Sequence, residues 1–233
     1  MSIAQKMDAV EIVPILKTEH IMKTRFDLDF CEKLIELGKT KINTEIVDNL
    51  EGVYRTGWDL QSDPDFESHL SYMAEVFSHC IERQSNYPHF GKGDHKSLEA
   101  QGFQLALSIL DTWIGYYDSN SFVHPHNHGQ LPNFWSCSAY LTTGEKSETS
   151  LSFMSDELPQ NAVTTLKINV KSGDVLIFPS KLFHYTNDCS GGRVVMASNF
   201  FCGYVPSLKS GENYQCQFIL FLMKKMEWNM TRI

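Results

Sequence analysis

Four histidines in two distant segments constrain this chain more than any other feature of its sequence. Three of them lie within His124-Pro-His126-Asn-His128, and His184 ends the segment that begins with the apolar run at Val175. Residues two apart on an extended strand point to the same side, so a His-x-His pair can aim two ring nitrogens at one point. A third ligand has to come from a distant segment, and His184 is placed to supply it. Neutral imidazole suits iron, zinc, copper or nickel.

The pairing of the first three histidines stays open at the level of sequence. His126 with His128 and His124 with His126 satisfy the same spacing, so His126 belongs to either pair. The competing interpretation is a solvated turn, since Pro125 and Asn127 are typical turn residues. The strand expected at residues 134–141 and the distant histidine favour a metal site.

A single arginine follows the distant histidine at a spacing typical of a hairpin. Arg193 comes directly after Gly191-Gly192, and it precedes an apolar run. We expect residues 187–192 to form a turn, so that two antiparallel strands bring His184 and Arg193 to one cavity. A guanidinium donates two parallel hydrogen bonds to a carboxylate, so the pattern predicts an anionic small molecule beside the metal.

The order of these motifs resembles the iron(II)- and 2-oxoglutarate-dependent oxygenases. It consists of His-x-His, an aromatic strand, an apolar strand led by Gly173-Asp174 that leads to His184, and Arg193 nine residues later. The chain is most similar to the prolyl-hydroxylase-like branch and to a group of bacterial and phage oxygenases with Pro-His-x-His. Two further elements also resemble that group: Val10–Pro14 and Thr56-Gly57-Trp58. The resemblance covers most of the chain and is strongest over residues 113–201.

The resemblance implies a metal site for Fe(II) and a role for each histidine. His126 and His128 would be the paired ligands, with His124 as the alternative to His128, and His184 would be the distal ligand. The commoner family motif is His-x-Asp, so His128 stands where an aspartate is expected. A neutral ligand there leaves the iron more positive, which makes activity a hypothesis rather than a consequence of the fold. Asp118 is a candidate for the missing carboxylate, although a loop or outer position suits it better.

The same resemblance implies 2-oxoglutarate as the co-substrate. Arg193 would bind its far carboxylate, helped by Tyr140 and Ser136. Ser136, Ser138 and Tyr140 share one face of their strand by alternation, which predicts a polar stripe along the cavity. The implied reaction hydroxylates a substrate that the sequence does not identify, which is either a protein or a small molecule. Succinate and CO2 would be the co-products, and no catalytic residue is expected beyond the metal site.

Two other functions fit the same residues. A three-histidine iron dioxygenase of the cupin type, which does not use 2-oxoglutarate, would also explain His128. A non-catalytic jelly-roll module, serving in binding or structure, would keep the fold without the chemistry. The presence of His126, His184 and Arg193 together favours the oxygenase. A zinc hydrolase is least supported, because no general base stands beside the histidines.

Length and charge agree with one enzyme-sized domain. The chain has 233 residues, 42% of them hydrophobic, and a formal net charge of −8, so nucleic acid is an unlikely partner. The start of the chain lacks the apolar core of a signal peptide, and no stretch is long enough for a membrane helix. We therefore expect a soluble, cytoplasmic protein, with a homodimer possible. Six cysteines without Cys-x-x-Cys spacing are expected to be mostly buried thiols.

Helical periodicity in the first half of the chain gives way to strands in the second. We expect helices at 27–41 and 65–84. The expected strands are at 10–16, 103–117, 134–141, 150–154, 164–170, 174–178 and 194–204. This order predicts an α+β fold with a double-stranded β-helix (jelly-roll, cupin-like) core braced by N-terminal helices.

We expect a single oxygenase-like domain over residues 1–233. An N-terminal strand and supporting helices would occupy residues 1–100, the jelly-roll core 101–205, and a C-terminal extension 206–233. The extension could be a strand, a docked helix or a dimer contact.

Overall fold

The structure is a computed structural model that describes most of the chain outside the loops and the two ends. It describes residues 11–14, 20–43, 52–84, 102–119, 121–129, 134–144, 149–154, 165–186 and 190–206. The chain divides into two compact units, one made of residues 1–92 and 106–203, the other of 93–105 and 204–233. All side chains discussed below belong to the first unit. The expected C-terminal extension lies outside the described residues from residue 207 onward.

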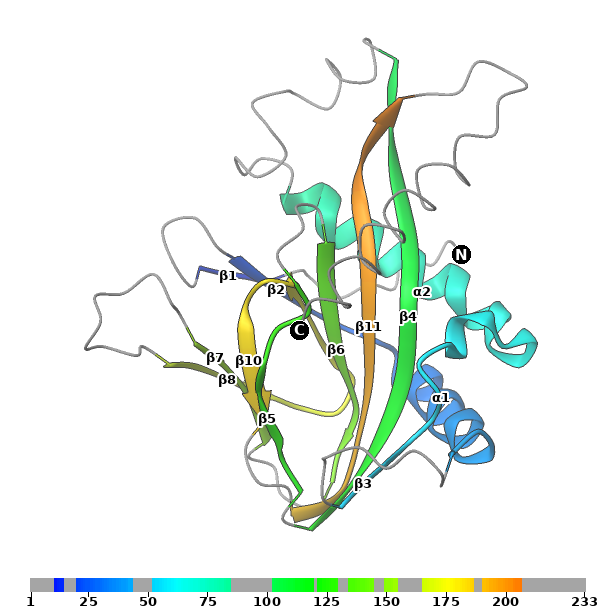
Figure 1. Ribbon diagram of the computed structural model, residues 1–233, viewed down its shortest axis with the longest axis vertical. Coiled ribbons are helices and arrows are strands. Elements are labelled where there is room, and N and C mark those ends of the chain that lie inside the picture. The colour runs from blue at the N-terminus through cyan, green and yellow to red at the C-terminus, as the bar shows by residue number, and fades with distance from the viewer. Residues whose placement is uncertain are drawn as a thin grey trace, which may run out of the picture. The chain divides into compact units, whose positions relative to one another are not determined.

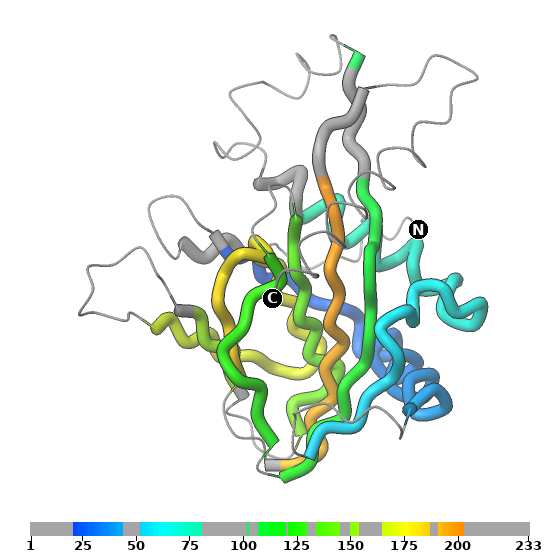
Figure 2. Tube along the Cα trace, in the orientation of Figure 1, coloured from blue at the N-terminus to red at the C-terminus, as the bar shows by residue number. Residues whose placement is uncertain are grey.

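Two β-sheets form the first unit and give the double-stranded β-helix that the sequence predicted (Figure 1). The larger sheet has the order β1-β2-β9-β6-β11-β4-β3, and the smaller has the order β5-β10-β7-β8. The strands of the larger sheet are β1 (Glu11–Pro14), β2 (His20–Arg25), β3 (Val53–Arg55), β4 (Phe103–Ser119), β6 (Phe134–Thr143), β9 (Asp174–Pro179) and β11 (Ser190–Pro206). Those of the smaller sheet are β5 (Val123–His126), β7 (Thr149–Met154), β8 (Thr165–Val170) and β10 (Phe183–Thr186). Figure 2 shows the two long strands β4 and β11 side by side.

Two helices form where the apolar periodicity placed them. They are α1 (Leu28–Thr40) and α2 (Pro64–Gln84), and a short 3-10 turn, η2 (Leu60–Ser62), precedes α2. The Asp27 side chain caps α1 by accepting from the Asp29 N–H at 2.9 Å. Pro64 occupies the first position of α2, where its missing N–H costs no hydrogen bond. Capping and periodicity together explain why both helix predictions were within two residues.

The helices cover one face of the larger sheet, and alternation along the strands selects which side chains meet them. Tyr116 on β4 donates its hydroxyl to the Ile35 carbonyl of α1 at 2.7 Å. Phe200 on β11 stacks on Phe77 of α2, with ring centroids 4.5 Å apart. The odd-numbered neighbours on β4 must therefore face the other way, toward the smaller sheet. That inner face carries the residues of the candidate site.

The space between the two sheets holds a buried apolar cluster. It consists of Ile21, Tyr140, Leu151, Phe153, Ile168, Val170, Leu176, Phe178, Leu182 and Val195. Phe153 of the smaller sheet meets Phe178 of the larger edge to face, with centroids 4.9 Å apart. These contacts fix the two sheets against each other beside the cavity.

The expected hairpin between His184 and Arg193 is wrong. β10 pairs with β5 and β7 in the smaller sheet, whereas β11 pairs with β6 in the larger. β11 also starts at Ser190, so Gly191 and Gly192 are strand residues with positive φ rather than turn residues. The connection thus crosses between sheets. His184 lines the cavity between them, and Arg193 contacts Thr186 and Tyr117 of the cavity wall.

The sequence analysis did not predict four strands, namely β2, β3, β5 and β10. β3, β5 and β10 have only three or four residues, too few for alternation to be visible. β2 reads His-Ile-Met-Lys-Thr-Arg, and its Lys23 and Arg25 look like a solvated segment. They instead form ion pairs with the buried Asp174 at 2.9 and 3.3 Å.

The described helices include none that is long and apolar enough to cross a membrane. Cys31, Cys80, Cys137 and Cys202 are buried thiols, as expected. The remaining two cysteines lie outside the described residues.

Candidate functional site

Three histidine side chains converge between the two sheets. His126 ends β5, His128 follows it, and His184 on β10 lies directly opposite His126 in antiparallel register. Their candidate ligand nitrogens all lie within 4.8 Å of one another. The ring centroids are 4.4 Å apart for His126 and His184, and 5.0 and 5.1 Å from these two to His128. A metal bound about 2.1 Å from each nitrogen needs the nitrogens about 3 Å apart, so the three histidines lie near the spacing of a metal site.

Each of these rings has its Nδ1 atom beside an oxygen that can only accept. The pairs are His126 with the His124 carbonyl at 2.8 Å, His184 with the Leu182 carbonyl at 3.0 Å, and His128 with Asn199 Oδ1 at 2.5 Å. Nδ1 must therefore carry the proton, which leaves the lone pair on Nε2. Metal-binding histidines are held in this way, with one ring nitrogen bonded to an acceptor and the other free for the ion.

A buried carboxylate fixes the orientation of the Asn199 amide. Asp111 Oδ1 accepts from Asn199 Nδ2 at 2.8 Å and from the Asn199 backbone N–H at 3.1 Å. The amide nitrogen is thereby held on the Asp111 side, and the amide oxygen faces His128. Asp111, Asn199 and His128 form a hydrogen-bonded chain that we call the Asp111 relay. Burial raises the pKa of Asp111 to about 6, and its bonds from Asn199 oppose that rise.

Ser136 and Ser180 tie His128 further to the larger sheet. The Ser136 hydroxyl donates to Asn199 Oδ1 at 2.7 Å and lies 2.9 Å from the Ser180 hydroxyl. The backbone N–H of His128 donates to the Ser180 carbonyl at 2.8 Å. Although Ser136 faces the cavity as the alternation predicted, its described contacts are to the surroundings of His128.

Burial keeps two of the three imidazoles neutral. It lowers the pKa of His184 to about 3 and that of His128 to about 4, because a charged ring loses its hydration in the interior. Neighbouring histidines lower the His184 value further. Neutral imidazole is the form that binds a metal ion, so these rings need no deprotonation step at neutral pH.

Arg193 and Tyr140 are buried residues on β11 and β6 of the larger sheet. Arg193 is 1% exposed, donates from Nη2 to the Thr186 hydroxyl at 3.3 Å, and has its guanidinium carbon 4.2 Å from the centre of the Tyr117 ring. Tyr140 is fully buried, and among the described residues its hydroxyl has no hydrogen-bond partner. Burial raises the pKa of Tyr140, and the charge of Arg193 opposes this rise. An uncompensated buried hydroxyl beside a buried cation is the environment that an anionic ligand would complete.

One cavity joins the three histidines and Tyr140. Its walls include the three histidines and, from the other face, Tyr140, Thr186 and Tyr117. Arg55, Trp58 and Trp113 line it as well, and no carboxylate does among the residues that the structure describes. The cavity is therefore suited to anions.

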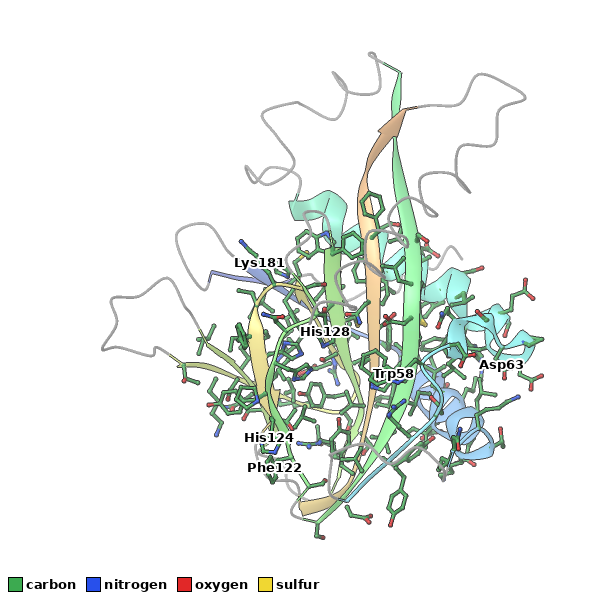
Figure 3. All side chains as sticks on the ribbon, in the orientation of Figure 1. Trp58, Asp63, Phe122, His124, His128 and Lys181 are labelled. Carbon is green, nitrogen blue, oxygen red and sulfur yellow. The ribbon has the colours of Figure 1, made fainter. Side chains whose placement is uncertain are left out.

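His124 and Asp118 lie outside this arrangement. Both are exposed, and the His124 ring meets Phe122 edge to face at 4.7 Å between centroids. Figure 3 shows His124 beside Phe122, away from His128 in the interior. The sequence analysis overlooked Asp111, Asn199 and Arg55. Asp111 and Asn199 could have been predicted, because each is a single carboxylate or amide inside an apolar strand.

A comparison with family models finds one match, which covers part of the chain. Residues 111–199 match the model of a family described as "Putative 2OG-Fe(II) oxygenase". A comparison with curated proteins finds no match. The description of the matched family names the same cofactor pair, iron(II) and 2-oxoglutarate, that the resemblance implied.

Solved structures of low sequence identity share the fold. HygX from Streptomyces hygroscopicus, with nickel and 2-oxoglutarate bound, is 14% identical, with 80% of this chain and 84% of that chain covered and a TM-score of 0.53. The epimerase SnoN, in complex with Fe3+, alpha ketoglutarate and nogalamycin RO, is 8% identical, with 83% and 87% covered and a TM-score of 0.54. Both likenesses confirm the double-stranded β-helix. The family match covers residues 111–199, which include the histidines and Arg193, and the two solved structures are similar to this chain in fold over most of its length.

Proposed function

We propose that this protein is an Fe(II)- and 2-oxoglutarate-dependent dioxygenase that hydroxylates its substrate and releases succinate and CO2. The observation that carries the proposal is the convergence of three imidazole rings in one cavity with Tyr140, while Arg193 contacts Thr186 and Tyr117 of the cavity wall. Iron and 2-oxoglutarate, once bound, supply the oxygen chemistry, and the protein supplies binding, orientation and exclusion of water.

His126, His128 and His184 are the proposed metal ligands. Their Nδ1 atoms are bonded to oxygens, so the three Nε2 lone pairs are available to one ion. His124 is the weaker candidate, because it is exposed and its backbone carbonyl already orients His126. Three ligands leave open positions on an iron ion for co-substrate and oxygen.

Arg193 is the proposed partner of the far carboxylate of 2-oxoglutarate. Its guanidinium is held by Thr186 and by the face of Tyr117, which fixes the plane from which it can donate paired hydrogen bonds. Tyr140 would donate its hydroxyl to the same co-substrate. Ser136 stays a candidate for the cofactor pocket, and its bond to Asn199 suits it to orienting His128 as well.

The three-histidine set makes the charge of the site unusual for this superfamily. No carboxylate touches the proposed iron position among the described residues, since the cluster contains only imidazoles. The Asp111 relay places a negative charge one residue behind His128. A carboxylate in that position makes an imidazole a stronger ligand, which compensates in part for the missing direct charge.

A three-histidine dioxygenase that does not use 2-oxoglutarate is the second candidate. The cluster itself favours it, since that chemistry needs only the three rings. Buried Arg193, in contact with Thr186 and Tyr117 of the cavity wall, favours the first candidate, because the far carboxylate of 2-oxoglutarate needs a cation. Cytoplasmic location, homodimerisation, the single-domain organisation and the absence of a nucleic-acid partner stay predictions from the sequence.

Succinate production tests the proposal directly. Protein loaded with Fe(II) in air should convert 2-oxoglutarate slowly to succinate even without a primary substrate. The His184→Ala variant should not do so, whereas His124→Ala should match the wild type. Oxygen consumption that ignores added 2-oxoglutarate would favour the second candidate. Iron binding without any turnover of 2-oxoglutarate would favour a non-catalytic module.

A further inference from the structure

We infer, on the basis of the proposed function, that the Thr186 hydroxyl donates a hydrogen bond to the far carboxylate of 2-oxoglutarate. Thr186 is then a co-substrate residue in its own right and not only a support for Arg193. It lies on β10, the strand that also carries the metal ligand His184.

Both acceptor positions of the Thr186 hydroxyl are occupied. Its oxygen accepts from the Val123 N–H at 3.0 Å and from Nη2 of Arg193 at 3.3 Å. A hydroxyl has two lone pairs and one hydrogen, so only the O–H hydrogen is left for a further bond. Among the residues that the structure describes, no group accepts this hydrogen. The hydroxyl can therefore bind a ligand only as a donor.

Thr186 belongs to the cavity wall. It is 8% exposed, and it lines the cavity together with His184 and Tyr140. A buried donor without an acceptor is unfavourable until a ligand or a water molecule supplies one. A carboxylate can only accept hydrogen bonds, so it is the ligand group that suits a hydroxyl whose lone pairs are both engaged.

β10 presents Thr186 and His184 on the same face. The two residues are two positions apart on an extended strand, and both are buried, whereas Tyr185 between them is partly exposed. Two positions along a strand correspond to about 7 Å. This spacing suits a ligand that binds the metal with one end and reaches Thr186 with the other.

Tyr140 supplies a matching hydroxyl from the larger sheet. It lies on β6, is fully buried, and its hydroxyl has no hydrogen-bond partner among the described residues. Burial raises the pKa of Tyr140, and the nearby charge of Arg193 opposes that rise, so both hydroxyls lie close to this guanidinium. A carboxylate has two oxygens that can each accept, so one hydroxyl from each sheet can hold it.

The Thr186 side chain is fixed by an irregular pairing of β5 with β10 (Figure 1). Thr186 pairs with Val123 and His184 with His126, so β5 has one residue more than β10 between the two pairs. The bond from the Val123 N–H restricts the Thr186 rotamer before a ligand binds, which lowers the entropy cost of binding. Since the same bond supports the strand of His126, a test has to separate ligand contact from support of the metal site.

Calorimetry on Zn(II)-loaded protein makes this separation with two ligands. 2-Oxoglutarate and 2-oxobutyrate share the 2-oxo acid group, and only 2-oxoglutarate has a far carboxylate. Thr186→Val removes the hydroxyl with little change of shape. We expect it to weaken 2-oxoglutarate binding about tenfold to hundredfold, the range for a hydrogen bond to a charged group. The affinities for 2-oxobutyrate and Zn(II) should not change.

Two further variants serve as controls. Thr186→Ser keeps the hydroxyl and should restore the wild-type affinity for 2-oxoglutarate. Thr165→Val makes the same substitution at an exposed position of β8 in the same sheet, and it should leave every affinity unchanged. Thr186→Ala is a second variant without the hydroxyl, to be used if Thr186→Val does not fold.

The Arg193→Lys background distinguishes direct contact from support of the guanidinium. If Thr186 donates to the ligand, adding Thr186→Val to Arg193→Lys should still weaken 2-oxoglutarate binding. If Thr186 only holds the guanidinium in place, the added substitution should cost no further affinity. That second result would overturn the inference.

The remaining outcomes separate Thr186 from the proposed function. Equal 2-oxoglutarate affinities in wild type and Thr186→Val would overturn the inference and leave the proposed function intact. A parallel loss of 2-oxobutyrate or Zn(II) binding would also overturn it, since Thr186 would then support only the metal site. Wild-type protein that binds Zn(II) but no 2-oxoglutarate would refute the proposed function and the role of Thr186 with it.

Discussion

Nδ1 of His128 lies 2.5 Å from Oδ1 of Asn199, which brings together the end of one sheet and the central part of the other. Because Asp111 holds the amide nitrogen of Asn199, only a protonated Nδ1 on His128 satisfies this contact. The relay thus selects the tautomer whose Nε2 carries the lone pair for a metal ion. It is the structural reason for regarding His128, and not His124, as the third ligand.

Asp111→Asn should weaken metal binding without unfolding the protein. The amide lacks the negative charge that polarises His128, and it adds a donor that competes with Asn199. We expect about tenfold to hundredfold lower affinity for Zn(II), the usual effect of losing an outer carboxylate. A competition titration with a chelating dye measures it, with the exposed Asp118→Asn on the same strand as control. Equal affinities in both variants would mean that Asp111 is only structural.

His128→Asp, which restores the commoner family motif, should bind metal poorly on its own. The amide oxygen of Asn199 would face the new carboxylate, and Asp111 prevents the amide from turning. Adding Asp111→Asn frees the amide to turn its nitrogen toward the carboxylate. The double variant should therefore bind Zn(II) more tightly than His128→Asp, and a purely additive loss would argue against the relay.

His184→Ala should abolish metal retention, whereas His124→Ala should not change it. His184 is 5% exposed and faces the other two rings, while His124 is exposed beside Phe122. Metal content after dialysis, measured by elemental analysis, tests both. If His124→Ala lost its metal and His128→Ala kept it, the two histidines would have to exchange roles.

Arg193→Gln should weaken 2-oxoglutarate binding by about 2 to 4 kcal/mol, the range for losing a buried charged partner. The 2-oxoglutarate affinity of Arg193→Lys should lie between those of the wild type and Arg193→Gln, because an ammonium keeps the charge and loses the paired geometry. Calorimetry on Zn(II)-loaded protein gives the affinities. The metal should stay bound in both variants. Unchanged 2-oxoglutarate affinity would remove Arg193 from the co-substrate site.

The metal-free protein should lose stability as the pH falls from about 6.5 to 4. Burial lowers the pKa of His128 to about 4 and of His184 to about 3. In this pH range these two side chains therefore bind protons in the unfolded chain but largely not in the folded protein. Each such histidine lowers the free energy of unfolding by up to about 1.4 kcal/mol per pH unit. Asp111, with its pKa raised to about 6, takes up a proton in the folded state and offsets part of this loss.

Urea denaturation at a series of pH values measures this dependence. His184→Ala should reduce the slope of unfolding free energy against pH by about one proton, because the variant lacks the ring whose pKa differs between the folded and the unfolded protein. Asp111→Asn should steepen it, because the opposing proton uptake disappears. A slope that neither variant changes would show that other groups control the acid sensitivity.

The sequence was sufficient for the elements whose physical signals are local. The caps and periodicity of α1 and α2 and the long apolar strands β4, β6 and β9 appear within a few residues of their predicted bounds. His126, His128 and His184 could be grouped because alternation and an ordered set of motifs are properties of the chain itself. The resemblance to the oxygenases followed from the same order of motifs, and the family match lies over residues 111–199.

Pairings between distant strands could not be predicted from local sequence patterns. β10 and β11 looked like a hairpin because they are close in sequence, yet their hydrogen-bond partners are β5, β7 and β6. The Asp111 relay joins residues 88 positions apart through one amide, so no local pattern marks it. Arg55 had no signal either, because its place in the cavity wall depends on the pairing of β3 with β4.

The most direct test of the proposed function is an anaerobic titration of metal-free protein with Fe(II) in the presence of 2-oxoglutarate. Chelation of iron by 2-oxoglutarate in this site should give a weak visible charge-transfer band that saturates at one equivalent of iron and is absent in His184→Ala. Arg193→Gln should require more 2-oxoglutarate to reach the same band. If no band forms and the protein retains no iron, the three histidines do not build the proposed centre, and the oxygenase function is wrong.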